Sequence, residues 1–334
     1  MSETRVNIIG KSNGVGLSRD LNLLCAALQR CGCEVNIMTI DGADAKRRRS
    51  PLRQLVTRLG LKLSGRTGGA RSDVSLMLEH IWSQYLDRAR HNIAIPNPEW
   101  FDRHDRRHLA AMDCVWAKTS CTQATFAALG CNTGFIGFDS EDRFEPGIVK
   151  QRTFFHLAGK STMKGTQDLL RIWARHPEWP LLIVVCHKVE AVGLQAAPAN
   201  VAVKVGYLSD GELKTLQNES AFHLCLSRTE GWGHYIVEAL SVRAVTITVD
   251  APPMNELVTP ERGLLVAYAG TGKQQLATTY FFDERALEVA VEGAMAMDDA
   301  AWARKADGAR EWFIQNKLGF PGRLDAALRE LLPN

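Results

Sequence analysis

The first forty residues show how hydrophobic and polar positions alternate along the chain. Arg5–Ile9 is a short, mostly apolar run that stops at Gly10, as a buried strand does. Between Ser18 and Cys31 apolar residues return every three or four positions, which predicts a helix, and Glu34–Ile40 is a second strand-like run. The chain therefore opens as strand, loop, helix and strand, which is how a parallel, doubly wound sheet begins.

Strand-like and helix-like segments continue in two series, with the polar stretch 139–151 as a linker between them. Two sheets of similar size, each with its own helices, indicate two facing α/β domains. Strands are expected at 74–78, 92–95, 114–117 and 135–138 in the first series, and at 153–157, 181–186, 202–205, 223–226 and 244–249 in the second. Helices are expected at 102–112, 120–129, 165–175, 210–218, 234–242, 284–297 and 302–316.

Length and composition are those of a globular protein. At 334 residues the chain exceeds the usual size of one hydrophobic core, which favours two domains, with one large α/β domain as the alternative. The apolar runs are far shorter than the roughly 20 residues of a membrane span. The first residues lack the basic and apolar segments of a signal peptide. We therefore expect a cytoplasmic protein.

The eight cysteines fit a reducing compartment. Cys31 and Cys33 are too close together for a zinc knuckle, and the others stand singly among apolar residues without metal-ligand spacing. We expect reduced thiols in the core and no metal site.

One segment is strongly basic: Lys46–Arg71 holds nine lysine or arginine residues and no acidic residue. Its leucines allow an amphipathic helix over residues 52–63 of the kind that lies on anionic membrane surfaces. A solvated loop explains the segment equally well. Nucleic-acid binding is less favoured, because the segment has no aromatic side chain to stack on bases.

The stretch RTEGWGHYIVEAL at residues 228–240 places Glu230 and Glu238 eight positions apart. Glu230 falls in a loop after a strand, and Glu238 lies about one turn inside the following helix. Gly231 and Gly233 permit a tight bend and leave backbone N–H groups open at the start of that helix. Such a helix start binds phosphate.

Two lysines stand in the loop after the first strand of the second series, within HLAGKSTMKG. Lys160 and Lys164 can neutralise the charge of a departing nucleotide diphosphate without a metal ion. Alone they would be read as ordinary surface lysines, but next to the glycine loop the phosphate interpretation is preferred.

These residues resemble the donor domain of retaining GT-B glycosyltransferases of the family 4 type. In that family a glutamate in Glu-Gly-Phe/Trp-Gly is followed eight positions later by a second glutamate, as in 230–238, and a basic residue and a Lys-Gly pair grip the diphosphate. Val205–Leu208 with 209–213 resembles the segment that lines the base pocket. The loop 251–258 stands where relatives have a Gly-Gly-Ile-Pro-Glu type of loop, but its wording departs from theirs. The resemblance is clear over roughly 153–265.

The resemblance implies a GT-B fold, with two facing Rossmann-like parallel-sheet domains and an interdomain cleft. It implies an acceptor-side domain at 1–150, a donor domain at 151–310, and a C-terminal helical segment at 311–334 that packs back toward the N-terminal domain. It further implies a metal-independent retaining transfer (EC 2.4) from a nucleotide-sugar, in which the diphosphate leaves, the acceptor hydroxyl enters on the same face, and the departing phosphate oxygen helps take its proton. Neither a cofactor nor a metal is expected.

The resemblance also assigns roles to residues. Glu230 would bind hydroxyl groups of the donor sugar and Glu238 those of the ribose, since a carboxylate can accept two hydrogen bonds from a vicinal diol. The catalytic set is Lys160, Lys164, Glu230 and His80. The donor-binding set is Gly14, Gly16, Leu208, Gly231, Trp232, Gly233, His234, Tyr235 and Glu238.

Candidates in the first half are fewer. Gly14 and Gly16 follow a strand, but Arg19 occupies the third glycine position of a dinucleotide-binding fingerprint, so a Rossmann dehydrogenase is not supported. His80 ends a strand, where relatives often have a histidine that contacts the donor sugar; a histidine in ordinary structural contacts is the alternative. In the loop 95–101 we expect exposed Asn97 and Glu99, with Trp100 able to stack on a sugar, as acceptor-binding residues; a plain rigid turn is the alternative.

Other functions remain open at this point. A glycosidase would need its two carboxyl groups about 5 to 9.5 Å apart across a sugar ring, which Glu230 and Glu238 do not obviously satisfy. Two merely structural glutamates, a non-catalytic sugar-nucleotide-binding scaffold subunit, and a sugar-phosphate synthase or phosphorylase of the same fold are further alternatives. The basic segment favours a glycan or lipid-linked acceptor in polysaccharide or glycoconjugate assembly, with the enzyme peripheral on the inner face of a membrane.

Overall fold

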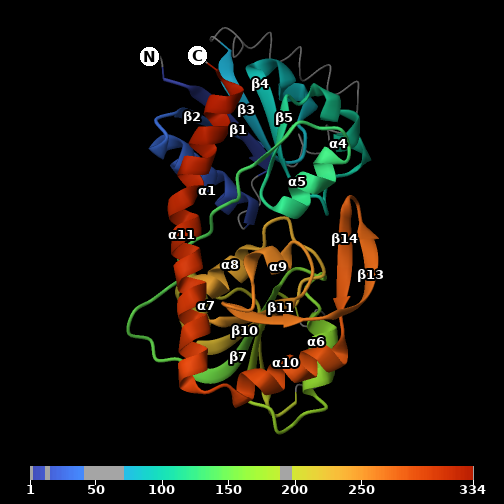
Figure 1. Cartoon of the computed structure of the whole chain (residues 1–334), viewed down its shortest axis with the longest axis vertical. Helices are drawn as coiled ribbons and strands as arrows, with labels where there is room; N and C mark the ends of the chain where they lie inside the picture. The colour runs from blue at the N-terminus through green and yellow to red at the C-terminus, as the bar shows by residue number, and fades with distance from the viewer. Residues whose placement is uncertain (1–2, 12–15, 41–70, 189–197, 334) are drawn as a thin grey trace. The chain divides into compact units, whose positions relative to one another are not determined.

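The computed structural model describes residues 3–11, 16–40, 71–188 and 198–333 (Figure 1). The chain divides into two compact units. Unit 1 comprises 1–139, 274–277 and 316–334, and unit 2 comprises 140–273 and 278–315. The predicted site residue Gly14 and all of the basic segment except Arg71 lie outside the described residues.

Unit 1 contains a six-stranded parallel sheet in the order β2-β1-β3-β4-β5-β6. In β1 the apolar run Val6–Ile9 is buried, as expected of a strand covered on both faces. Val6 pairs with Val35 on one side and with Val74 on the other. The strands are β1 (Arg5–Lys11), β2 (Glu34–Ile40), β3 (Ser72–Glu79), β4 (Ala89–Pro96), β5 (Cys114–Ala117) and β6 (Thr133–Phe135).

Short helices connect these strands: α1 (Gly16–Arg30), η1 (Ser83–Arg88), α4 (Arg103–Arg107), η2 (Leu109–Ala111) and α5 (Ser120–Ala127). The predicted helix 102–112 is wrong in its length, because it is divided at His108, whose N–H donates to the Asp105 carbonyl three residues back. The predicted strand 135–138 is displaced: β6 covers Thr133–Phe135 and ends before Gly137, whose φ of +64° leaves the extended conformation.

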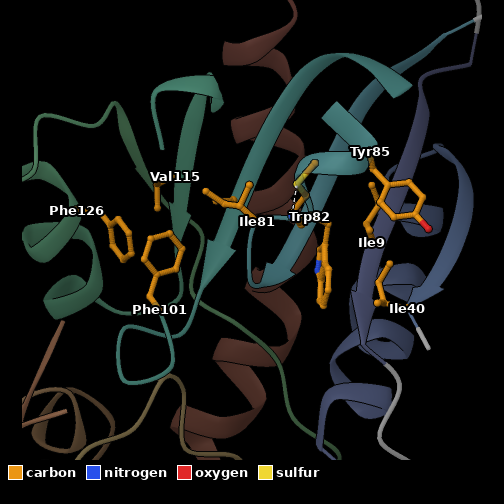
Figure 2. Close-up of a cluster of buried hydrophobic side chains, with 10 residues drawn as sticks. Ile9, Ile40, Ile81, Trp82, Tyr85, Phe101, Val115 and Phe126 are labelled. Carbon is orange, nitrogen blue, oxygen red and sulfur yellow. Dashed lines mark hydrogen bonds between the residues drawn. The ribbon is translucent and has the colours of Figure 1, made fainter. Parts of the chain in front are cut away.

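The core of unit 1 contains a cluster of buried side chains from several strands and loops (Figure 2). Phe101 and Phe126 meet edge to face with ring centroids 4.9 Å apart. Trp82, which follows the end of β3, is 1% exposed in the same cluster. This packing fixes the backbone just beyond the carboxyl ends of β3 and β4.

Unit 2 contains a second six-stranded parallel sheet in the order β12-β11-β10-β7-β8-β9. Its strands are β7 (Gln151–Gly159), β8 (Leu182–Cys186), β9 (Val201–Val205), β10 (Ser220–Cys225), β11 (Val245–Val249) and β12 (Gly263–Val266). Its helices are α6 (Thr166–Trp173), α7 (Asp210–Glu219), α8 (His234–Ser241), α9 (Met254–Leu257) and α10 (Glu284–Ala296). The two sheets confirm the predicted α/β class.

Two elements differ from the sequence prediction. A hairpin of β13 (Tyr268–Gln274) and β14 (Ala277–Phe282), orange in Figure 1, was not foreseen. Its first strand, YAGTGKQ, contains glycines and polar residues, whereas β-branched and aromatic residues are the ones enriched in strands, so no strand pattern marks this segment. The helix expected at 302–316 is longer, because α11 runs over Asp299–Leu331 with Pro321 inside it.

The described chain bears on three further expectations. All eight cysteines are free thiols. Within the described ranges no group of three His, Cys, Asp or Glu residues is placed to hold a metal ion. No helix in those ranges is both long and apolar enough to cross a bilayer.

Two buried histidines of unit 2 lie among strands and helices. The Nδ1–H of His156 donates to the Leu224 carbonyl (2.8 Å), and its Nε2 lies 2.8 Å from Thr166 Oγ1. The Nε2–H of His223 donates to the Gln217 carbonyl (3.0 Å). Burial lowers the pKa of His156 to about 4 and that of His223 to about 3, from 6.5.

Acid is therefore expected to destabilise unit 2. Because both folded-state pKa values lie below that of an unfolded histidine, the unfolded chain binds more protons, and stability is lost as the pH falls from about 6.5 toward 4. We expect roughly 1–2 kcal/mol per histidine at about pH 5. His223→Gln keeps a donor for Gln217 and should shrink the difference in unfolding free energy between about pH 7.5 and 5, measured with urea, whereas His91→Gln should not. An unchanged difference in His223→Gln would contradict this assignment.

Candidate functional site

The loop between β7 and α6 carries the two predicted lysines. It ends at Gly165, which has φ +65° and is the N-cap of α6, without a side-chain cap. A Cβ atom at Gly165 would lie 2.9 Å from the Phe282 ring and 3.1 Å from the Leu226 carbonyl, so only glycine fits. Lys160 is exposed and Lys164 is half-buried.

The side chain of Lys164 packs against the Tyr235 ring. Its Nζ donates to the Leu157 carbonyl (2.8 Å) and lies 3.8 Å from the centre of the Tyr235 ring, a cation–π contact. Burial lowers the pKa of Lys164, while the nearby carboxyl groups, Glu230 first among them, act in the opposite direction. The Lys164 cation is thus held between the Leu157 carbonyl and the Tyr235 ring.

The loop between β10 and α8 lies beside the lysine loop. The carboxyl ends of parallel strands meet at one edge of a sheet, and β10 pairs with β7. The Arg228 N–H donates to the Met163 carbonyl (2.8 Å), which joins the two loops directly. The second loop ends at Gly233, with φ +85°, the N-cap of α8, again without a side-chain cap. Two helices therefore begin at this edge with backbone N–H groups that no side chain caps.

Glu230 is held by a short chain of hydrogen bonds. Ser227 Oγ donates its hydrogen to Glu230 Oε1 (2.5 Å). Because that hydrogen is already used, the Tyr235 hydroxyl donates to Ser227 Oγ in the second bond (2.5 Å). The Ser227 N–H donates in turn to the Tyr235 hydroxyl (3.1 Å). Burial raises the pKa of Glu230, and Lys164 acts against that rise. The carboxyl group and the Lys164 cation are therefore electrostatically coupled.

Glu238 lies in the second turn of α8 and is 3% exposed. Its Oε2 accepts a hydrogen bond from the Gln217 side chain (3.2 Å). The predicted position of this glutamate, inside the helix that starts at His234, is confirmed. Its role in ribose binding stays a prediction.

The remaining residues of the loop pack inward. Trp232 is 5% exposed, and its Nε1–H donates to Ser140 Oγ (3.1 Å), which also lies 2.8 Å from Nδ1 of His234. Gly231 and Tyr235 are buried too. Beneath Tyr235 lies Cys225, whose thiol has a pKa raised by burial and whose sulfur is 3.9 Å from the Tyr235 carbonyl. The loop is thus anchored at both ends.

A pocket of about 710 Å³ opens beside the lysine loop. Among the described residues its walls include Lys160 but not Lys164 or Glu230. Three of its basic residues were not predicted: His187 and Lys188, which follow β8, and Arg228, which pairs with Asp168 (3.4 Å) and stacks on the Phe281 ring (4.5 Å). Arg228 could have been predicted, because it is the first residue of the stretch RTEGWGHYIVEAL. Lys188 could have been predicted as a cation that closely follows an apolar strand.

The predicted base segment follows β9. Leu208 is half-buried and packs against Phe155, Ile183 and Val185. Tyr207 beside it is 88% exposed. The structure thus places Leu208 in the packing of unit 2, with an aromatic ring open to solvent next to it.

His80 lies in unit 1, directly after β3. Its Nδ1 lies 2.9 Å from the fully buried carboxylate of Asp105, and its Nε2 lies 3.7 Å from Glu79. Glu79 has φ +63°, an uncommon conformation for a residue other than glycine, and burial raises its pKa. Sequence reasoning missed both acidic residues, because neither stands in a motif. Gly16 is the first residue of α1.

The predicted acceptor loop is only partly exposed. Trp100 is 45% exposed, as expected, but Glu99 is 7% exposed and Asn97 is half-buried, so the expectation of exposure is wrong for Glu99. The reason is a turn: the Trp100 N–H donates to the Asn97 carbonyl (3.0 Å), and buried Phe101 draws the loop inward. Asn97 Oδ1 accepts from Lys118 Nζ (3.3 Å).

Comparison with known families decides what this arrangement is. Residues 138–277 match the family model described as glycosyl transferases group 1. This part of the chain is therefore similar to the group 1 glycosyl transferases. The matched residues include the lysine loop, the two glutamates and the residues that line the pocket. Comparison with curated protein sequences gives no match.

Solved structures add the fold of the whole chain. A glycosyltransferase from Rickettsia africae ESF-5 matches with TM-score 0.75 and 13% identity, covering 100% of both chains. Sucrose-phosphate synthase from Thermosynechococcus elongatus matches with TM-score 0.72 and 15% identity, covering 98% of this chain and 99% of that one. HepE of Anabaena, in complex with UDP and glucose, matches with TM-score 0.70 and 15% identity, covering 98% and 100%.

The fold of the chain is therefore GT-B, as the resemblance implied. At these identities the likeness establishes the fold and leaves the substrates open. Family and fold together support glycosyl transfer as the activity.

Proposed function

We propose that the protein is a retaining glycosyltransferase that moves a sugar from a nucleotide-sugar donor to a glycan or lipid-linked acceptor. The observation that carries this proposal is the convergence, at one edge of the unit 2 sheet, of Lys164, Glu230 and two helix starts that no side chain caps. Anionic phosphate suits the helix starts and the lysine, and a sugar diol suits the carboxylate.

In the proposed reaction the diphosphate is held by N–H groups at the starts of α6 and α8 and by Lys160 and Lys164. As the bond between the anomeric carbon and the phosphate oxygen breaks, negative charge grows on the diphosphate, and these groups stabilise it more in the transition state than before. The leaving oxygen takes the proton of the incoming acceptor hydroxyl, so no side chain attacks. No metal ion is required in this scheme.

The two glutamates divide the recognition of the donor. Glu230, coupled to the Lys164 cation and fixed by Ser227, binds hydroxyl groups of the transferred sugar. Glu238, deeper in α8, binds the ribose hydroxyls. Leu208 and its neighbours line the part of the site that binds the nucleotide base. The loop that contains Trp232 holds Glu230 and the start of α8 in place.

A calorimetric panel tests the proposal. UDP, GDP, ADP, CMP and dTDP and their sugars are titrated with and without EDTA, and we expect one nucleotide to bind saturably in both conditions. HepE with UDP and glucose makes UDP the first choice. Glu238→Ala should weaken nucleotide binding by about 100-fold, since the carboxylate that accepts from the two ribose hydroxyl groups is lost. If no nucleotide binds, the proposed donor role is refuted and a phosphorylase of the same fold is favoured. Loss of binding with EDTA would refute metal independence.

A second candidate function has support from one observation. The pocket beside Lys160 is lined by His187, Lys188 and Arg228, a basic set that suits a sugar phosphate. Because sucrose-phosphate synthase shares the fold, sugar phosphates belong among the acceptors to be tried. Turnover with a sugar phosphate and none with glycans or lipid-linked glycans would favour a synthase.

Unit 1 supplies the proposed acceptor residues Asn97, Glu99 and Trp100, and His80 as the proposed contact to the donor sugar. Among them the half-exposed ring of Trp100 is suited to stack on a sugar. The burial of Glu99 makes it a weaker candidate for direct contact.

The basic segment Lys46–Arg71 motivates the membrane part of the proposal, with the enzyme cytoplasmic and peripheral on the inner face of a membrane. Deleting residues 46–71 removes nine positive charges and should abolish co-sedimentation with vesicles containing about 30% anionic lipid at low salt, while nucleotide binding stays unchanged. Vesicle binding that survives the deletion would refute this part alone.

A further inference from the structure

A buried polar relay lies behind Glu238, among residues outside the proposed donor contacts. Gln217 of α7 is 1% exposed, and its Nε2 donates to Glu238 Oε2 (3.2 Å). Its Oε1 accepts from Arg143 Nε (3.0 Å), and Arg143 is itself 3% exposed. The three side chains thus form a line from the linker to α8.

The chemistry of the relay permits one orientation of the Gln217 amide. Arg143 has only N–H donors, so the group that faces it must be the amide oxygen. If the amide were reversed, its NH₂ group would face the Arg143 N–H and its oxygen would face the Glu238 carboxyl group, which are two repulsive contacts. The NH₂ group therefore points at Glu238 and restricts the orientation of that carboxyl group.

Arg143 is in turn held from three sides. Its Nη1 pairs with Asp210 (2.5 Å) and its Nη2 donates to the Asp210 carbonyl (3.2 Å), in the first turn of α7. Its backbone N–H donates to Ser241 Oγ (3.0 Å), and that hydroxyl donates to the Glu238 carbonyl (2.7 Å). The relay therefore ties the start of α7, directly after the base segment, to both the backbone and the side chain of Glu238.

We propose that Gln217 and Arg143 are positioning residues that hold the Glu238 carboxyl group for the 2′,3′-diol of a nucleotide ribose. This inference rests on the proposed function and deepens it. A carboxylate has about four lone-pair sites, so a hydrogen bond from Gln217 is compatible with further bonds from a diol. A freely rotating carboxyl group would lose conformational entropy each time a ligand binds, whereas one that is already oriented loses less. The relay thus sets the preference for an intact ribose and leaves phosphate binding unaffected.

The test compares ligands that differ only in the diol. UDP, GDP and ADP, their 2′,3′-dideoxy forms and inorganic pyrophosphate are titrated into the full chain by calorimetry. The unmodified chain should bind the ribose form of its preferred nucleotide about 100-fold more tightly than the dideoxy form. Gln217→Met, of similar volume, should reduce this ratio to about 10-fold while pyrophosphate affinity stays within about twofold.

Two further variants keep the proposal testable if Gln217→Met folds poorly. Gln217→Glu places a second carboxyl group against Glu238 and should reduce the ratio further. Arg143→Lys keeps a positive charge but lacks the Nε–H that fixes the amide, and should also reduce it. The matched control is Gln315→Met, because Gln315 donates to Glu311 (2.7 Å) at an exposed site in the same unit. That variant should retain the full ratio.

The outcomes separate this inference from the proposed function. If Glu238→Ala loses the ribose preference but the Gln217 and Arg143 variants keep it, the relay has no positioning role and the proposed function stands. If ribose and pyrophosphate affinities fall together in the relay variants, the relay is only structural and the inference is overturned. If the unmodified chain binds none of the nucleotides, the proposed function and the relay's role are both refuted.

Discussion

Replacing Lys164 with methionine is expected to lower kcat by about 100-fold or more, while nucleotide affinity falls less than about tenfold. Methionine keeps the packing over the Tyr235 ring but removes the cation that lies 3.8 Å from it. That cation matters most when charge has built up on the leaving diphosphate. Kinetics with the donor found in the panel, together with calorimetry of the free nucleotide, measure the two quantities.

The control for this variant is Lys305→Met, because Lys305 Nζ also donates to a backbone carbonyl of unit 2, that of Gly263. It should leave kcat and affinity unchanged. Equal losses of turnover and affinity in Lys164→Met would show that the lysine binds ground state and transition state alike. Because burial lowers the pKa of Lys164, the alkaline loss of turnover should begin below the ordinary lysine pKa of 10.5.

Replacing Glu230 with alanine should reduce kcat/KM for the nucleotide-sugar by about 100-fold or more and leave the affinity for the free nucleoside diphosphate almost unchanged. The proposed contacts of this carboxyl group are to the sugar, so a ligand without the sugar does not lose them. Glu292→Ala, at an exposed position of α10, is the control. A parallel loss of affinity for the free diphosphate would remove Glu230 from the sugar and place it at the phosphates or in the fold.

The acid side of the pH profile offers a second readout for Glu230. Because burial raises its pKa, turnover should fall as the pH drops, starting above the ordinary glutamate pKa of 4.5. Ser227→Ala removes a hydrogen bond that favours the charged carboxylate, so the midpoint should move to higher pH in that variant. A midpoint that does not respond to Ser227→Ala would show that another group controls the acid limb.

The sequence predicted the two sheets well because buried parallel strands are short apolar runs, and such runs can be read locally. The helix start at His234 was also predicted from local sequence, because glycines precede it and apolar residues follow it at helical spacing. The β13–β14 hairpin was missed because glycine, threonine and lysine residues fill β13. Its pairing depends on contacts with other segments, such as the bond from the Tyr280 N–H to the Arg228 carbonyl (2.7 Å).

The candidate site was predicted where a motif marks it and missed where only the fold brings residues together. Lys164, Glu230 and Glu238 stand at recognisable spacings. Gln217 stands 21 residues before Glu238 and Arg143 stands 74 before Gln217, with no pattern to join them. Glu99 was expected at the surface because it follows a proline, but burial of the neighbouring Phe101 decides its position.

The buried thiol of Cys225, at the end of β10, can report on the loop between β10 and α8. A thiol reagent attacks the thiolate, and burial both blocks access to this sulfur and raises its pKa, so labelling requires the α8 region to open. The labelling rate of Cys225 therefore measures the free energy of local opening under native conditions, as amide exchange does for a backbone N–H. A bound nucleotide that holds the loop closed would slow that rate in proportion to its occupancy.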